Sequence, residues 1–253
     1  MRLNPSILLL LNLVCWVFSP TRVEGAGQKP LFTESAVPLP PGVLEAQIGV
    51  EFLRNQSFPF STPSTDFNRD LWKILTFGLH LGLDKRTELQ LDYDLLYLNE
   101  EAPGVGQEFG SGDLRIFTKI QILGDAPTHP ALALRIGTKL PNANDEARLG
   151  TNETDFLSAL LVTKFYQRMA FHANVGLAIL GSPNQPTLQD DLLLFGFAAL
   201  LPAFDAFHWV MEVEGQALSR KNNDVATLRL GFQVKTGEVQ WYLGGGVGLT
   251  DQA

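Results

Sequence analysis

Cysteine is nearly absent from this chain of 253 residues. Cys15 is the only one, and it lies in an apolar run close to the N-terminus. If that run is removed on export, the mature chain has no cysteine, which excludes disulfide scaffolds, zinc-thiolate sites and thiol catalysis together. Cys15 follows Asn12, Leu13 and Val14 and comes too early to be a lipoprotein acceptor. We therefore expect the sheet itself to hold the fold together.

Positive charge is also scarce. Lys and Arg number 19 against 27 Asp and Glu, which gives a formal net charge of −8 without any basic cluster. A nucleic-acid partner would need a basic face, so none is expected. Long apolar runs are missing too, because Ile7–Phe18 is shorter than the roughly 20 residues that a membrane-spanning helix requires.

The N-terminus has the features of an export signal. Arg2 supplies the positive charge, Ile7–Phe18 supplies the apolar core, and Val23 and Gly25 occupy the −3 and −1 positions of a cleavage site. We expect residues 1–25 to be a cleaved signal peptide, in preference to a retained anchor.

From residue 43 onward, apolar and polar residues alternate. In Arg86–Leu98, one parity holds Glu88, Gln90, Asp92 and Asp94, and the other holds Thr87, Leu89, Leu91, Tyr93, Leu95 and Tyr97. Such alternation predicts a β-strand with one apolar and one polar face. In a soluble sheet the apolar face lies in the core, whereas in an outer-membrane barrel it faces lipid and the polar face lines the lumen.

Eleven segments carry strand patterns, and most run for about 10–12 residues, the length of a tilted membrane-crossing strand. They are Val43–Leu53, Leu71–Leu83, Arg86–Leu98, Gly112–Leu123, Ala131–Leu140, Thr154–Phe165, Ala170–Gly181, Asp191–Leu201, Phe207–Leu218, Asp224–Lys235 and Glu238–Leu249. Of these, only Thr154–Phe165 is ambiguous between helix and strand. Long and short connections alternate along the chain, as they do in outer-membrane barrels. Asn99–Ser111 is one of the expected long loops.

The polar parity predicts a charged lumen. If the apolar faces point at lipid, fourteen polar side chains converge inside the barrel. They are Glu88, Gln90, Asp92, Asp94, Arg115, Lys119, Arg135, Lys139, His172, Asn174, Glu212, Glu214, Arg229 and Gln233. Two interpretations stay open: a ladder of cross-strand ion pairs that fills the lumen, or a polar constriction that sets solute preference.

Aromatic residues gather near strand ends, as in the interfacial girdles of membrane barrels. They are Phe165, Tyr166, Phe171, Phe204, Phe207, Trp209, Trp241 and Tyr242. Core aromatics near turns would give the same pattern, so the pattern does not decide between the two.

No constellation of residues indicates catalysis, and no enzyme activity, metal or cofactor is expected. The four histidines are far apart and form no pair at metal-ligand spacing. His172 could act as the base of a hydrolase, but no serine is marked as its partner, and a hydrogen-bonded lumen residue is the better interpretation. Asp66, Asp70, Asp145 and Glu146 could bind a divalent cation in the outer loops, although solvated loop charge is favoured.

Five segments, taken in their order and spacing, carry a family pattern: Pro38–Phe52, Gly78–Glu88, Ser111–Lys119, Ala131–Pro141 and Phe171–Gly176. The chain resembles the bacterial outer-membrane barrels named after the meta pathway of phenol degradation, often labelled transporters. The resemblance covers the whole mature chain, implies a porin-like barrel and brings no catalytic residues.

Members of that family add a strand after the stretch that corresponds to Gly248–Asp251, and single-chain barrels have an even number of strands. We therefore expect an all-β, antiparallel, up-and-down transmembrane β-barrel of the twelve-strand type. About eleven strands are visible, and the closing strand is missing from a sequence that we expect to be truncated. In this division, residues 26–42 form a periplasmic lead-in that is rich in proline and residues 43–253 form the barrel.

The expected function is a porin-like channel in the bacterial outer membrane for passive passage of small solutes, aromatic ones if the family label applies. Its partners would be outer-membrane lipids and lipopolysaccharide, the barrel-assembly machinery and the solute. Two alternatives stay open: a non-conducting structural barrel, and a soluble lipocalin-like periplasmic binding barrel. Burial separates the last from the others, because Leu89, Leu91 and Ile116 point outward in a membrane barrel and inward in a soluble one.

Overall fold

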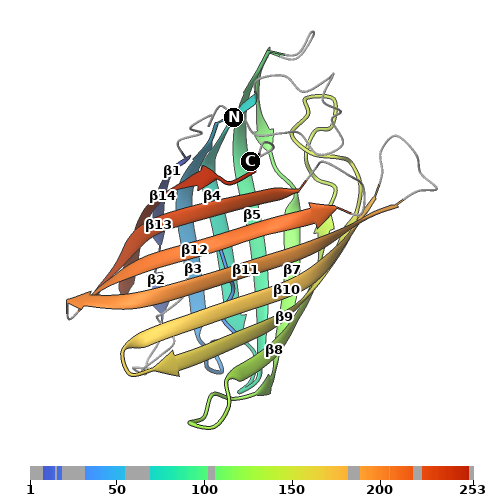
Figure 1. Ribbon diagram of the computed structural model, residues 1–253. Helices are drawn as coiled ribbons and strands as arrows, with labels where there is room; N and C mark the ends of the chain where they lie inside the picture. Colours follow the sequence, from blue (N-terminus) through green and yellow to red (C-terminus); the bar gives the residue numbers. More distant parts are fainter. Residues whose placement is uncertain are drawn as a thin grey trace.

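The computed structural model describes residues 8–14, 16–18, 32–54, 69–101, 106–181, 189–204, 206–218 and 224–250. The strands among these residues form one large antiparallel sheet that curls on itself (Figure 1). Its strands are β1 (Leu8–Val14), β2 (Trp16–Phe18), β3 (Leu44–Leu53), β4 (Arg69–Gly82), β5 (Thr87–Glu100), β6 (Gly106–Ser111), β7 (Leu114–Leu123), β8 (Ala131–Leu140), β9 (Asp155–Tyr166), β10 (Met169–Gly181), β11 (Gln189–Phe204), β12 (Phe207–Leu218), β13 (Val225–Thr236) and β14 (Val239–Gly248). No helix among the described residues is long and apolar enough to cross a membrane.

The sheet closes into a barrel because β1 pairs with both β14 and β3. β1 and β2 pair with successive parts of β3, so together they occupy one position in the wall. In the same way, β6 and β7 pair with successive parts of β5 and occupy one position. The described strands therefore fill twelve positions, an even number, as in bacterial single-chain outer-membrane barrels. The position between β14 and β3 is occupied by residues from the segment interpreted as an export signal.

The remaining strands follow the sequence pattern closely. Each of the eleven expected strands is present with its ends shifted by at most three residues, and the ambiguous segment is strand β9. The expectation that Asn99–Ser111 is entirely a loop is wrong, because Gly106–Ser111 forms β6. β6 has only six residues, two of them glycine, and no apolar run marks it in the sequence.

The two faces of the wall are chemically opposite. Large apolar side chains are exposed on the outside, among them Leu177 (55% exposed), Leu230 (54%) and Phe197 (51%). Charged side chains are buried on the inside, including Glu88 and Lys119, each with no exposed surface. A soluble barrel would have the reverse arrangement, because water disfavours a continuous apolar outer face. An apolar interior also avoids the cost of burying charges, which is several kcal/mol for a charge without a partner. The apolar face lies on the outside of the barrel, and the lipocalin-like alternative is therefore wrong.

The aromatic residues near the turns divide between the two faces. Phe204, Phe207, Trp209 and Phe232 form an aromatic cluster in which the rings of Phe207 and Phe232 stack with centroids 5.0 Å apart. Phe204 and Trp209 are 74% and 51% exposed, as members of an interfacial girdle would be. Phe165, by contrast, packs against the buried cluster of Ala170, Leu200 and Val210. The girdle interpretation thus holds for only part of the set.

Candidate functional site: the interior of the barrel

Each of the fourteen polar residues singled out in the sequence lies on the inward parity of its strand. Eight of them are buried, namely Glu88, Gln90, Asp94, Lys119, His172, Glu212, Arg229 and Gln233. The other six, Asp92, Arg115, Arg135, Lys139, Asn174 and Glu214, are partly accessible from the lumen. Strand alternation together with a closed sheet is sufficient to bring them into a single interior.

Ion pairs connect the inward faces of β5, β7 and β8. Lys119 Nζ lies 3.1 Å from Glu88 Oε1, and Arg115 Nη2 lies 2.7 Å from Asp94 Oδ2. The pairing extends one strand further through Arg135, whose Nε donates to Gln90 Oε1 at 2.7 Å. Asp92 is the second partner of Arg135, at 3.6 Å. The expected cross-strand ladder is therefore present, and it stiffens this side of the wall.

Three further polar side chains, which the sequence did not place among the fourteen, lie on the inward faces of β3 and β4. His80 on β4 lies with its Nδ1 3.6 Å from Glu88 and its Nε2 3.3 Å from Asp92. Lys73, also on β4, pairs with Glu51 of β3 at 2.6 Å. A bulge near Lys73 breaks the simple alternation of β4, so that parity counted along the sequence misplaces one half of this strand.

Residues 32–42 cross the interior from one wall to the other, and their backbone amides bind inward-facing side chains. The amides of Phe32 and Thr33 donate to the Glu212 carboxylate on β12. On the opposite side, the Leu39 amide donates to Glu88 Oε2 on β5 at 2.7 Å. Between these ends, the Ala36 amide donates to Thr163 Oγ1 on β9 at 2.9 Å. We call residues 32–42 the crossing segment.

Side chains of the crossing segment fit the wall as well. Glu34 pairs with Lys119 at 3.2 Å, and Phe32 lies beneath the Arg229 guanidinium, 3.9 Å from its carbon. Where the segment passes closest to the wall, the wall residues are small. A Cβ on Gly82 would lie 2.0 Å from the Pro40 carbonyl oxygen, and Ala36 packs against Ala131 and Ala133. The inner wall therefore has a shape and a set of polar groups that are complementary to the crossing segment.

His172 has the role that the sequence favoured. Its Nδ1 lies 2.9 Å from Thr163 Oγ1, and its side chain is 1% exposed. Because Thr163 Oγ1 accepts from the Ala36 amide, its own proton is available for His172. The pair thus fixes the crossing segment and presents no exposed nucleophile.

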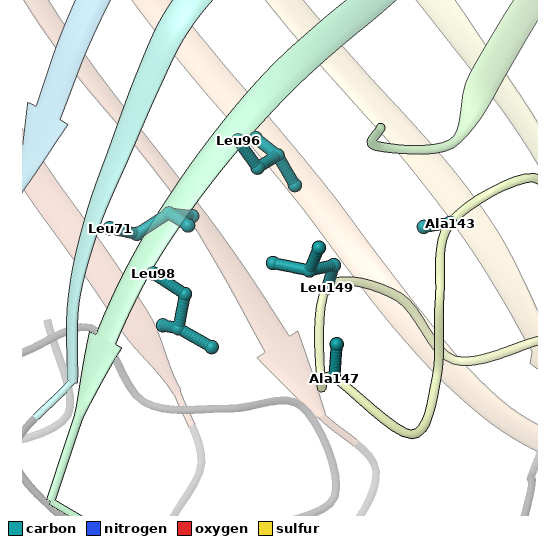
Figure 2. Packing of buried hydrophobic residues seen from close by; sticks show 6 residues of the cluster. All are labelled: Leu71, Leu96, Leu98, Ala143, Ala147 and Leu149. Atoms are coloured by element: carbon teal, nitrogen blue, oxygen red, sulfur yellow. The ribbon is translucent and has the colours of Figure 1, made fainter. Parts of the chain in front are cut away.

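A second inward structure occupies the other end of the barrel, where residues 141–153 connect β8 to β9. Ala143, Ala147 and Leu149 of this connection pack against Leu71 of β4 and Leu96 and Leu98 of β5. Figure 2 shows Leu149 directed toward β5 from the inward-folded connection. Asp145 and Glu146, considered above as cation ligands, are exposed on its outer side, whereas Asp66 lies outside the described residues.

The interior carboxylates described above are paired with lysine or arginine side chains or accept hydrogen bonds from backbone amides. Within the described part of the chain, no group of three or more His, Cys, Asp or Glu side chains is placed to hold a metal ion. What the arrangement can do is restrict passage: it combines a charged wall, a crossing segment and an inward-folded connection with an apolar patch beneath it.

The sequence and the fold were compared with those of known proteins. A family model described as "Putative MetA-pathway of phenol degradation" matches residues 28–251. The solved COG4313 outer membrane channel from Pseudomonas putida F1 has a similar fold, with a TM-score of 0.55 and 11% identity over 90% of this chain and 100% of that one. The solved CymD monoaromatic hydrocarbon channel aligns with a TM-score of 0.39 and 8% identity, over 98% of this chain and 90% of that one. None of the curated proteins matches the sequence significantly.

Proposed function

We propose, from the premise that this chain belongs to the family described as "Putative MetA-pathway of phenol degradation", that it is an outer-membrane channel for small apolar or aromatic solutes. The main support for a membrane location is the distribution of side chains in the wall. Leu177, Leu230 and Phe197 are exposed on the outside, and Lys119 and Glu88 are buried on the inside. Membrane barrels have this arrangement because the outer face contacts lipid hydrocarbon, whereas the inner face contacts water or other polar groups in the lumen. The outer-membrane channel of similar fold from Pseudomonas putida F1 supports the same interpretation.

The fourteen inward polar residues are proposed to line the route. The charges in the constriction compensate each other in pairs, Asp94 with Arg115 and Glu214 with Arg229, so these pairs offer no net charge that would attract an ion. We therefore expect an uncharged solute to pass in preference to an ion. Lipopolysaccharide outside the barrel and the assembly machinery during insertion are the further partners that this location would require.

One observation favours a second candidate, the non-conducting barrel. The crossing segment is held at three places on the wall, by Glu212, Thr163 and Glu88. If it never leaves this seat, the barrel would be closed to solutes, and its function would be structural.

Export through a cleaved signal peptide is also proposed. In the structure, β1 pairs with β14 and β3, and β2 pairs with β3, so cleavage after residue 25 would remove both strands from the wall. N-terminal sequencing of the protein extracted from outer membranes distinguishes the two cases. A start at Ala26 supports cleavage, and a start near Met1 contradicts it.

The function is tested by reconstituting the purified protein in vesicles that carry lipopolysaccharide and following entry of a radiolabelled monoaromatic compound. Entry several-fold faster than in empty vesicles, with little acceleration for a charged solute of the same size, supports the proposal. No acceleration for any solute, together with silent planar bilayers at several potentials, supports the structural candidate.

A further inference from the structure

We propose that residues 141–153, here called the outer lid, cover an apolar solute site formed by Leu71, Leu96 and Leu98, and that Glu100 is the latch that keeps the lid down. The assignment of a solute to this site rests on the proposed function. The latch and the movement of the lid do not.

The site beneath the outer lid is made of apolar side chains from β4 and β5. Leu98 has no exposed surface, and Leu71 and Leu96 are 5% and 6% exposed, although all three side chains point into the lumen. What covers them is Leu149, at 7% exposure, with Ala143 and Ala147 beside it (Figure 2). An apolar concavity with few polar groups is the usual form of a site for a small apolar molecule. Leu149 therefore occupies the position that such a solute would take.

The latch is a single carboxylate between two guanidinium groups. Glu100 ends β5, and its side chain is 1% exposed. Arg148 of the outer lid lies 3.0 Å from Glu100 Oε1, and Arg69 of β4 lies 3.7 Å from Glu100 Oε2. Arg69 Nη2 also donates to the Arg148 carbonyl oxygen at 3.0 Å. Without the Glu100 charge, two cations would face each other across the edge of the lid, and like charges at this range repel.

The base of the outer lid is fixed separately from its tip. Asp113 Oδ1 accepts from the amides of Asn142 and Ala143 at 3.0 and 2.9 Å. Lys139, at the end of β8, binds Asp155 at 2.8 Å and Thr151 Oγ1 at 2.8 Å. These contacts hold both ends of the lid beside the wall, so that the part carrying Arg148 and Leu149 can turn about them.

The tip is a folded unit that is joined to the wall by side chains. The amides of Arg148 and Leu149 donate to the carbonyl oxygens of Asp145 and Asn144, within the lid itself. Within the described residues, the backbone hydrogen bonds made by residues 141–153 all have both partners among residues 140–149. Lifting the tip would therefore leave the ladder of the barrel intact. Segments with few backbone bonds to their surroundings are the ones that open locally.

The latch is tested without any transported solute, by labelling a cysteine under the lid. In a background with C15S, L98C should react slowly with an apolar maleimide, and E100Q should make the reaction at least ten-fold faster. The matched control is E146Q, which removes an exposed carboxylate of the same lid and should leave the rate unchanged. Hydrogen exchange of residues 141–153 should rise with E100Q in the same way, in protein that carries leucine at position 98. Equal rates in the E100Q and E146Q variants would overturn the latch.

Locking the lid tests its effect on passage. A Cβ at position 110 would lie 2.8 Å from Leu149 Cδ1, so position 110 adjoins the lid. The test uses the pair G110C/L149C in the C15S background, after mass spectrometry has confirmed that oxidation joined the two cysteines. The oxidised protein should lose solute entry and regain it on reduction. Entry that persists in the oxidised protein would overturn the lid, whereas no entry in either state, with wild type also inactive, would count against the proposed function alone.

The solute site is tested by protection. Toluene should slow maleimide labelling of the L98C variant at least three-fold when E100Q is also present, because the site is then uncovered. A hydrophilic molecule of similar size, such as glycerol, should not slow it. Labelling that toluene leaves unchanged would overturn the site while leaving the latch result intact.

Discussion

Lys119 and Glu88 face each other across strands β7 and β5, with Nζ and Oε1 3.1 Å apart and neither side chain exposed. Glu88 also accepts from the Leu39 amide, and Lys119 also pairs with Glu34. One buried pair thus joins two strands of the wall to the crossing segment. Burial of this kind is tolerated only because each charge is paired and hydrogen-bonded.

Replacing Lys119 with methionine should destabilise the barrel by about 3–5 kcal/mol, because Glu88 and Glu34 would both lose their cationic partner. Urea unfolding of the protein in lipid vesicles measures the change. K85M is the matched control, since Lys85 is exposed in the β4–β5 turn and should change stability by no more than about 0.5 kcal/mol. Equal stability of the two variants would show that the pair is not buried as described.

Replacing Glu212 with alanine should release one end of the crossing segment. The Glu212 side chain accepts from the amides of Phe32 and Thr33, and hydrogen bonds of this kind contribute about 0.5–1.5 kcal/mol each. Single-channel conductance in planar bilayers should rise several-fold in E212A. The control E238A, in the exposed β13–β14 turn, should keep the wild-type value. Conductance that stays at the wild-type level in E212A would mean that this contact does not hold the segment across the lumen.

Glycine is required at position 137 on β8. An added Cβ would lie 2.1 Å from Phe117 Cδ1 and 2.3 Å from the Ile116 carbonyl oxygen, so both the ring and the strand would have to move. Phe117 cannot move freely, because the Arg135 guanidinium carbon lies 3.5 Å above its ring. Such overpacking costs about 1–3 kcal/mol. G137A should therefore lower the urea midpoint, whereas G124A, where no atom lies within 4 Å of the new Cβ, should not.

The turn between β4 and β5 should make stability depend on acidity. Hydrogen bonds from the Arg86 amide (2.7 Å), and then from Thr87, hold the pKa of Asp84 below its ordinary value of 3.8. A lowered pKa means that the stabilisation is fully present above pH 3.8 and is lost as pH falls through the folded value. D84A should therefore be less stable than wild type at about pH 7, with the difference shrinking below pH 3.8. A difference that is constant across this range would contradict the assignment.

Much of this architecture could be predicted from the sequence because alternation in a strand has a period of two. Residues 88–94 already divide into an apolar parity and a polar parity in which three of four residues are acidic, and the neighbouring Arg115 and Lys119 have the complementary charge. Closure of the sheet then leaves only one interior for all the polar faces, so the fourteen inward residues followed directly.

Other features leave no periodic signal. Much of the binding of the crossing segment uses backbone amides, which every residue except proline carries, and its side-chain contacts through Phe32 and Glu34 have no repeating spacing that would mark a lumen segment. The partner of Glu212 was also unexpected. Glu212 lies opposite Arg229 in the strand register, as the sequence indicates, but its carboxylate takes the amides of the crossing segment. Arg229 pairs with Glu214 instead, at 2.5 Å.

The orientation of the wall is measured most directly by spin labels on single cysteines, in the C15S background, with the protein in lipid vesicles. Val175 and Leu177 lie on the outer face, and Asn174 and Glu214 lie on the inner one. Labels at 175 and 177 should relax faster with lipid-dissolved oxygen than with a water-soluble nickel chelate, and labels at 174 and 214 should show the opposite preference or none. Oxygen preference at 174 and 214 with nickel preference at 175 and 177 would place the charged face outside and contradict the membrane barrel.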